Sequence, residues 1–180
     1  DAGKSIDEVA SVASFFLSRI DVVVDPMLEE KGLTDLKGEV AIASAKKAYQ
    51  IYQEVFASDR FKKLEEKGAK TQRVLWASTG VKDPSFSDVK YVEALIGPET
   101  VNTMPRPTIT AFLDHGVVAR TVDKNLDEAR QVQVRDAAGR ISRALRSSVT
   151  ALRWWKAGLE MLAVGALAAA VSYGVGWLIA

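Results

Sequence analysis

The sequence predicts an α/β fold in which short parallel strands alternate with helices, and three observations support this prediction. Apolar runs rich in β-branched and aromatic residues recur at Val9–Phe16, Val74–Ala77 and Val101–Met104. Each run is followed by a segment with helical periodicity or helix-capping residues. Each run also ends in small polar residues followed by a cation, an asparagine or a proline. Strands separated by helices usually pair in parallel, and the side chains at their carboxyl ends commonly line ligand sites.

The first strand is predicted at Val9–Phe16, and the first helix at Leu36–Phe56. In this helix apolar side chains recur every three to four residues, with Tyr52 and Phe56 beside them, which indicates one apolar stripe. The stripe consists of Val40, Ala43, Lys47, Ile51 and Val55. Ser58 is then expected to cap a short charged helix that ends at Gly68.

The remaining elements continue the alternation. They are a strand at Val74–Ala77, a helix at Ser87–Ile96, a strand at Val101–Met104 and a helix at Thr108–Asp114 closed by Gly116. Pro105 and Pro107 end the third strand, because proline has no N–H to donate to a sheet. A sheet of only three parallel strands leaves two edges unpaired. An isolated half-barrel with such a sheet is therefore not expected to be a stable, active enzyme.

Composition excludes several kinds of site. The chain of 180 residues has 24 basic and 23 acidic side chains, and its net charge of +1 predicts no general attraction to nucleic acid. The absence of cysteine excludes disulfides, thiolate metal sites and cysteine nucleophiles. A single histidine excludes a multi-histidine metal site within one chain.

Polar side chains follow the first two strands at the point where ligands bind in parallel sheets. Ser14, Phe16 and Arg19 stand where the first strand ends, and arginine offers a planar fork of donors that suits a phosphate. Ser78 and Lys82 follow the second strand, where lysine can serve as a point charge for the same kind of group. The alternative to a phosphate site is that Arg19 is an exposed arginine after a core strand and that Lys82 is a solvated lysine in an ordinary loop.

Three motifs carry a resemblance to a known family. Ser14-x-Phe16-x-x-Arg19, Trp76-Ala-Ser78 and Asn102-Thr-Met-Pro105 resemble the last three strands of transaldolases of the long actinobacterial and cyanobacterial type. The resemblance implies that residues 1–130 form part of a (β/α)8 TIM barrel, namely its last three strand–helix units. It further implies a sugar-phosphate pocket to which Ser14, Phe16, Arg19, Ser78 and Lys82 contribute, with Arg19 on the phosphate.

The resemblance also implies an activity and its limits. Transaldolases of the pentose phosphate pathway transfer a dihydroxyacetone unit between sugar phosphates through a lysine Schiff base, without metal or organic cofactor. In the family that lysine lies on an earlier strand, and no lysine here stands within an apolar strand. We therefore expect a fragment that begins inside a helix-to-strand connection, has no catalytic residue of its own and is inactive alone.

The C-terminal part differs sharply in charge. Residues 131–156 carry six cations against one carboxylate, and their apolar stripe predicts a basic amphipathic helix or linker able to lie on anionic lipid. Residues 157–180 are predicted to form a transmembrane helix, because the uncharged run Met161–Ala180 has about the 20 residues that a bilayer requires. The alternative for this run is a helix buried in a soluble core.

The predicted membrane segment indicates where the half-barrel lies in the cell, and it also suggests alternatives to a transaldolase-like fragment. Cations precede the apolar run and none follows it, so the half-barrel is expected on the cytoplasmic side, anchored to the inner face of the membrane. The segment from Trp154 to Trp177 weakly resembles the final membrane helix of the vacuolar iron transporter family. The alternatives to a transaldolase-like fragment are thus a membrane-protein fragment of iron-transporter type with a vestigial soluble part, or an artefactual joint near Arg130.

Overall fold

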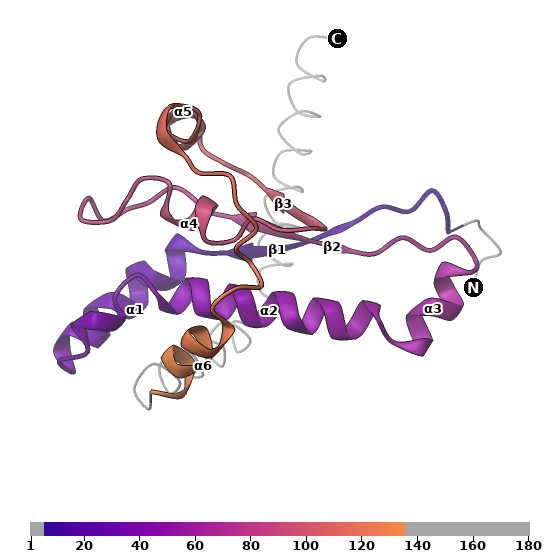
Figure 1. The fold of residues 1–180 in the computed structure, drawn as a ribbon, viewed down its shortest axis with the longest axis horizontal. Coiled ribbons are helices and arrows are strands. Elements are labelled where there is room, and N and C mark those ends of the chain that lie inside the picture. Colours follow the sequence, from indigo (N-terminus) through magenta and orange to yellow (C-terminus); the bar gives the residue numbers. More distant parts are fainter. Residues whose placement is uncertain (1–5, 136–180) are drawn as a thin grey trace, which may run out of the picture. The chain divides into compact units, whose positions relative to one another are not determined.

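A computed structural model of the chain describes residues 6–135, which form a small parallel sheet flanked by helices (Figure 1). The strands are β1 (Val12–Phe16), β2 (Arg73–Ala77) and β3 (Thr100–Asn102). The longer helices are α1 (Ser18–Glu30), α2 (Val40–Phe56), α5 (Arg106–His115) and α6 (Leu126–Val134). The shorter ones are α3 (Asp59–Glu65), α4 (Lys90–Glu93) and the 3-10 turn η1 (Thr34–Leu36).

The sheet has the strand order β1-β2-β3, and both pairs are parallel. Ser14 pairs with Leu75, and Leu75 pairs with Val101, so the strands share one register. The predicted α/β class with parallel strands is confirmed, and this sheet is consistent with part of a (β/α)8 barrel.

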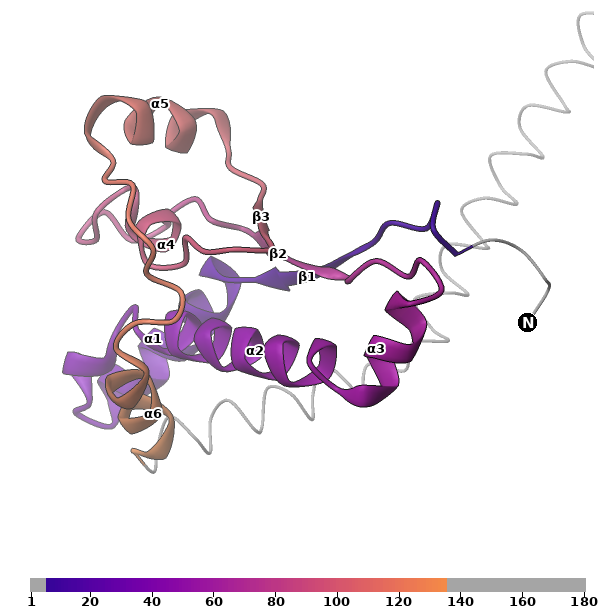
Figure 2. The same cartoon turned by 45° about the vertical axis from the view of Figure 1, so that its right-hand side comes forward.

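The hydrophobic core lies between the sheet and the helices α2 and α4. In both views α1, α2 and α6 lie on one side of the sheet, and α5 lies on the other side beyond β3 (Figures 1 and 2). Trp76 is almost fully buried, its indole N–H donates to the Leu95 carbonyl at 3.0 Å, and the Phe15 ring meets it edge-on. The buried cluster consists of Leu17, Ala41, Ile42, Ala45, Tyr49, Val74, Trp76, Tyr91, Leu95 and Val122.

The opposite face of β1 is open to solvent. Side chains alternate along a strand, so Val12, Ser14 and Phe16 share the face away from Phe15. All three are exposed, with 43% of Phe16 accessible. A strand with an exposed aromatic on one face and an unpaired edge is the geometry expected where a larger sheet continues.

Helix α1 was missed by the sequence analysis, which predicted no helix between Phe16 and Leu36. Its buried side includes Val24 and Leu28, but also the acidic residues Asp21 and Asp25. Carboxylates on the buried side and Pro26 inside the helix interrupt the apolar period on which the prediction depended. Arg19 therefore lies in the first turn of a helix and not in a loop.

The buried face of α2 matches the predicted stripe only in part. Val40 and Ala43 are buried as predicted, but Ile51 and Val55 are about half exposed. The helix instead buries Ile42, Ala45 and Tyr49, which recur at three- and four-residue spacing on a neighbouring face. The C-terminal half of α2 packs through Tyr52 and Phe56, whose rings contact each other, and Phe56 also meets Phe61.

Of the predictions for the shorter helices, one is confirmed and one is wrong. The Ser58 cap is confirmed, since its hydroxyl accepts from the Phe61 amide at 3.4 Å. The helix predicted at Ser87–Ile96 is wrong in length, because only α4 is helical. Two backbone groups beyond α4 are engaged elsewhere: the Leu95 carbonyl accepts from Trp76, and the Ile96 amide donates to the Thr121 hydroxyl at 3.1 Å.

No helix within residues 6–135 is long and apolar enough to cross a membrane. The predicted transmembrane helix at 157–180 lies outside the described residues, as does most of the basic segment 131–156.

Candidate functional site

The carboxyl ends of β1 and β2 are joined by backbone hydrogen bonds that fix where α1 begins. The Leu17 amide donates to the Ala77 carbonyl at 2.9 Å, and the Ser18 amide donates to the Ser78 carbonyl at 3.0 Å. Ser78 has a φ of 54°, in the left-handed region, which turns the chain directly after β2. The predicted site residue Ser78 is thus held beside the first turn of α1.

Three of the predicted site residues are grouped at the end of β1. Ser14 and Phe16 lie on the open face of the strand, and Arg19 is an exposed residue in the first turn of α1. The Arg19 guanidinium carbon stands 4.6 Å from the centroid of the Phe16 ring. Within residues 6–135 no carboxylate forms an ion pair with Arg19, so its donors are available to an anion.

Lys82 lies in a cavity beside α1. This cavity of about 420 Å³ is also lined by Ser18, Asp21, Asp25 and Tyr91. Arg19 does not line it, although Arg19 and Lys82 both follow the carboxyl ends of neighbouring parallel strands. The structure therefore places both cations at the same end of the sheet.

Asp21 is the most constrained polar group of this cavity. Its side chain is 2% exposed, Oδ1 accepts from the Ala41 amide at 2.9 Å, and Oδ2 accepts from the Tyr91 hydroxyl at 2.7 Å. Burial raises the pKa of Asp21 to about 6, although both hydrogen bonds act in the opposite direction. A carboxyl group with this pKa can exchange a proton near neutral pH.

Asp25 lies one turn further along α1 and also supports the cavity wall. One of its oxygens accepts from the Gly38 amide at 3.0 Å, and burial raises its pKa. The sequence analysis missed both aspartates, because it predicted no helix here. The four-residue spacing of Asp21 and Asp25, with Val24 and Leu28 beside them, was the available signal for a helix that buries two carboxylates.

Two buried polar atoms at this end of the sheet have no hydrogen-bond partner. They are Ser18 Oγ, in the first residue of α1, and Asn102 Oδ1, in the last residue of β3. Buried polar atoms are normally hydrogen-bonded, so the hydrogen bonding at this end of the sheet is incomplete within the described residues.

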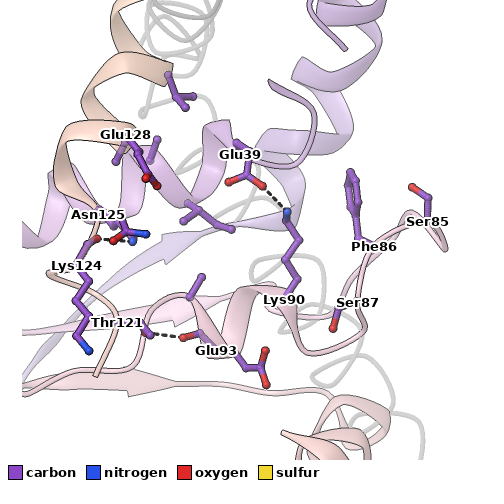
Figure 3. Close-up of a pocket in the computed structure, with 16 residues that line it drawn as sticks. Glu39, Ser85, Phe86, Ser87, Lys90, Glu93, Thr121, Lys124, Asn125 and Glu128 are labelled. Carbon is purple, nitrogen blue, oxygen red and sulfur yellow. Dashed lines mark hydrogen bonds and ion pairs between the residues drawn. The ribbon is translucent and has the colours of Figure 1, made fainter. Parts of the chain in front are cut away.

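A second cavity, of about 720 Å³, lies elsewhere, among α2, α4 and α6 (Figure 3). Lys46, only 8% exposed, lines it and donates to the Lys124 carbonyl at 2.7 Å. Desolvation lowers the pKa of Lys46. The sequence places this lysine on a helix but does not show that it is buried. Among residues 6–135 no group of histidine and carboxylate side chains could hold a metal ion.

Comparisons with known proteins give a consistent family. Residues 1–150 match the family model described as Transaldolase/Fructose-6-phosphate aldolase. A transaldolase of Trichodesmium erythraeum is 52% identical over 141 residues, which cover 72% of this chain and 37% of that protein. A transaldolase of Saccharopolyspora erythraea is 56% identical over 117 residues, covering 64% of this chain and 32% of the relative. The chain thus spans about a third of the length of these relatives.

Proposed function

Because this chain belongs to the Transaldolase/Fructose-6-phosphate aldolase family, we propose that residues 6–135 supply the phosphate-holding part of a sugar-phosphate site. The complete site would transfer a dihydroxyacetone unit between sugar phosphates through a lysine Schiff base. In this proposal the three strands are the last three units of a (β/α)8 barrel, assigned by their motifs. The remaining strands, whatever chain contributes them, complete the barrel.

The grouping of Arg19 with Ser14 and Phe16 carries this proposal. The Phe16 ring holds the guanidinium at 4.6 Å, and the hydroxyl of Ser14 lies on the same open face of β1 as that ring. Arg19 also lies in the first turn of the 13-residue helix α1, where backbone N–H groups add partial positive charge. A planar fork of charged donors, a hydroxyl and a helix start together suit a phosphate monoester.

The residues of the three strands also support the proposal that this chain binds the phosphate and that the Schiff-base lysine lies elsewhere in the barrel. None of β1, β2 and β3 contains a lysine, so a Schiff-base amine on a barrel strand has to come from another part of the barrel. The unpaired atoms Ser18 Oγ and Asn102 Oδ1 lie at the carboxyl ends of the two edge strands, β1 and β3, with which the remaining strands of the barrel would pair. The proposed role of this chain is therefore binding and not bond formation.

A titration of the 180-residue chain tests the phosphate site. Fructose 6-phosphate is expected to shift amide resonances around Arg19 in a ¹H–¹⁵N spectrum, whereas fructose is expected to leave them unchanged. Arg19→Gln is expected to weaken binding about tenfold, because one charge-assisted hydrogen bond contributes about 1.5 kcal/mol. Arg60→Gln is the matched control, since Arg60 is an exposed arginine on α3 and its loss changes the net charge equally. Equal weakening by both substitutions would refute a site at Arg19.

Borohydride trapping tests the absence of the nucleophile. Incubation with fructose 6-phosphate and borohydride is expected to leave no lysine of this chain covalently modified. The buried Lys46 is not an exception, because a ketose would have to carry its charged phosphate out of water to reach an amine that is 8% exposed. A stoichiometric adduct on any lysine would contradict the proposed role.

A further inference from the structure

The cavity among α2, α4 and α6 contains a lysine in an unusual environment. Lys46 belongs to α2, and its ammonium group donates to the carbonyl of Lys124, in the turn before α6, at 2.7 Å. Figure 3 shows Lys124, Asn125 and Glu128 on the wall of this cavity. The residue is 92% buried, whereas its neighbour Lys47 is exposed. Two adjacent lysines on one helix thus differ almost completely in hydration.

The hydrogen bonds of Lys46 are incomplete. An ammonium group has three N–H donors, and within residues 6–135 only the Lys124 carbonyl accepts from Nζ. No carboxylate of this part of the chain lies within ion-pair distance of Nζ; Glu128, Glu39 and Asp123 act on it only from further away. Because the charged form is poorly compensated, desolvation lowers the pKa of Lys46 and enlarges the fraction of neutral amine.

We propose that Lys46 is an acylation site, approached through the 720 Å³ cavity and modified by a small uncharged thioester. The neutral Nζ attacks the thioester carbonyl carbon, a C–N bond forms and the C–S bond breaks. The sulfur leaves with the bonding electron pair and takes up the proton released by nitrogen. The products are an amide on Lys46 and a free thiol, so no further reactant is needed.

The surroundings of Lys46 suit both the reactant and the product. The cavity lining balances Glu39, Glu93 and Glu128 against Lys90 and Lys124, and Glu39 is paired with Lys90 at 2.6 Å. A neutral thioester enters such a charge-balanced cavity without having to bury an unpaired charge. The amide product keeps one N–H, which can retain the hydrogen bond to the Lys124 carbonyl. The product also carries no charge, so the cost of burying an incompletely paired ammonium disappears. A cavity of 720 Å³ has ample room for the added acetyl group.

The test compares Lys46 with Lys47 in the same molecule. The full chain is incubated with the acetyl thioester of N-acetylcysteamine, a neutral probe, and is then cleaved after glutamate. The peptide from Val40 to Glu54 contains Lys46 and Lys47 as its only lysines, so fragment ions give both acetylation rates from one sample. At about pH 7.5 Lys46 is expected to react several-fold faster than Lys47, and the difference is expected to vanish in concentrated urea.

Two results would overturn the proposal. The first is a Lys46 rate equal to or below that of Lys47 in the folded chain. The second concerns Ala129→Phe, which places a large ring on the α6 wall of the cavity. In a variant whose circular dichroism matches the parent, this change is expected to slow acetylation of Lys46 and leave Lys47 unchanged. An unchanged Lys46 rate would exclude the cavity as the route.

Discussion

Replacing Asp21 by asparagine removes a buried charge while keeping the shape and both hydrogen bonds of the side chain. Asparagine Oδ1 can accept from the Ala41 amide as Asp21 does at 2.9 Å. Its Nδ2 can donate to the Tyr91 hydroxyl oxygen, which now acts as acceptor in place of the 2.7 Å bond that it donates to Asp21. The substitution therefore isolates the electrostatic cost of the carboxylate at a position that is 2% exposed.

The size of the effect follows from the pKa of Asp21, which burial raises from 3.8 to about 6. One pKa unit corresponds to about 1.4 kcal/mol, so the shift corresponds to about 3 kcal/mol. Because the folded-state pKa is the higher one, the folded state binds more protons between about pH 4 and 6, and the free energy of unfolding falls as pH rises through this window. At pH 7 the asparagine variant is expected to be more stable than the parent by up to about 3 kcal/mol.

Urea unfolding followed by far-UV circular dichroism from about pH 3.5 to 8 measures this difference. The free-energy difference between the Asp21→Asn variant and the parent is expected to be small at the acid end, to grow up to pH 6 and then to level off. Asp59→Asn, at an exposed position on α3, is the matched control and is expected to give a flat difference near zero. Asp21→Ala is expected to be about 2–3 kcal/mol less stable than the asparagine variant, because it loses two buried hydrogen bonds. A pH-independent difference between Asp21→Asn and the parent would refute the reasoning.

Two further predictions concern packing and pH. Gly97→Ala is expected to lower the free energy of unfolding by about 1–3 kcal/mol, because its Cβ would stand 2.2 Å from Cγ1 of the fully buried Val122. Chemical denaturation of the single and double variants checks this: Val122→Ala makes room for the new methyl, so the two losses are expected not to add. His115 has a raised pKa, chiefly through its hydrogen bond to Asp88 and then to Asp114. Its stabilising effect is expected to be present below about pH 6.5 and to disappear as pH rises through the raised pKa. The difference between the parent and His115→Gln, measured by denaturation at pH 6 and 8, is expected to be small, because the pair is exposed, and to shrink in high salt. A difference that does not change between the two pH values would contradict this assignment.

The strands and the short polar signals were predictable because their causes are local. Val74, Trp76 and Ala77 read as a strand from their own composition, and the Ser58 hydroxyl caps α3 through atoms three residues away. The predicted site residues Ser14, Phe16 and Arg19 were likewise identified from one continuous segment. In the structure they lie together at the end of β1, with the Arg19 guanidinium over the Phe16 ring.

The site's buried groups were not predictable in the same way. The Asp21 carboxylate accepts from Ala41 and from Tyr91, which lie 20 and 70 residues away in the sequence. Burial lowers the pKa of Lys46, and the carbonyl to which its ammonium group donates, that of Lys124, lies 78 residues away. A charged side chain on a helix is usually solvated, so its burial becomes visible only when the distant segments that cover it are placed.

The sequence by itself determined the α/β class, the three strands, their shared polar ends and the family, since these depend on composition, periodicity and short motifs. Only the tertiary structure decided which face of α2 is buried, that α1 follows β1 directly, and that Lys82 shares a cavity with Asp21. Periodicity shows that a helix has an apolar side, but the segments that pack against the helix determine which of its residues are buried. The shifted pKa values of Asp21 and Lys46 could also be found only from the tertiary structure, because desolvation depends on all the segments that surround a group.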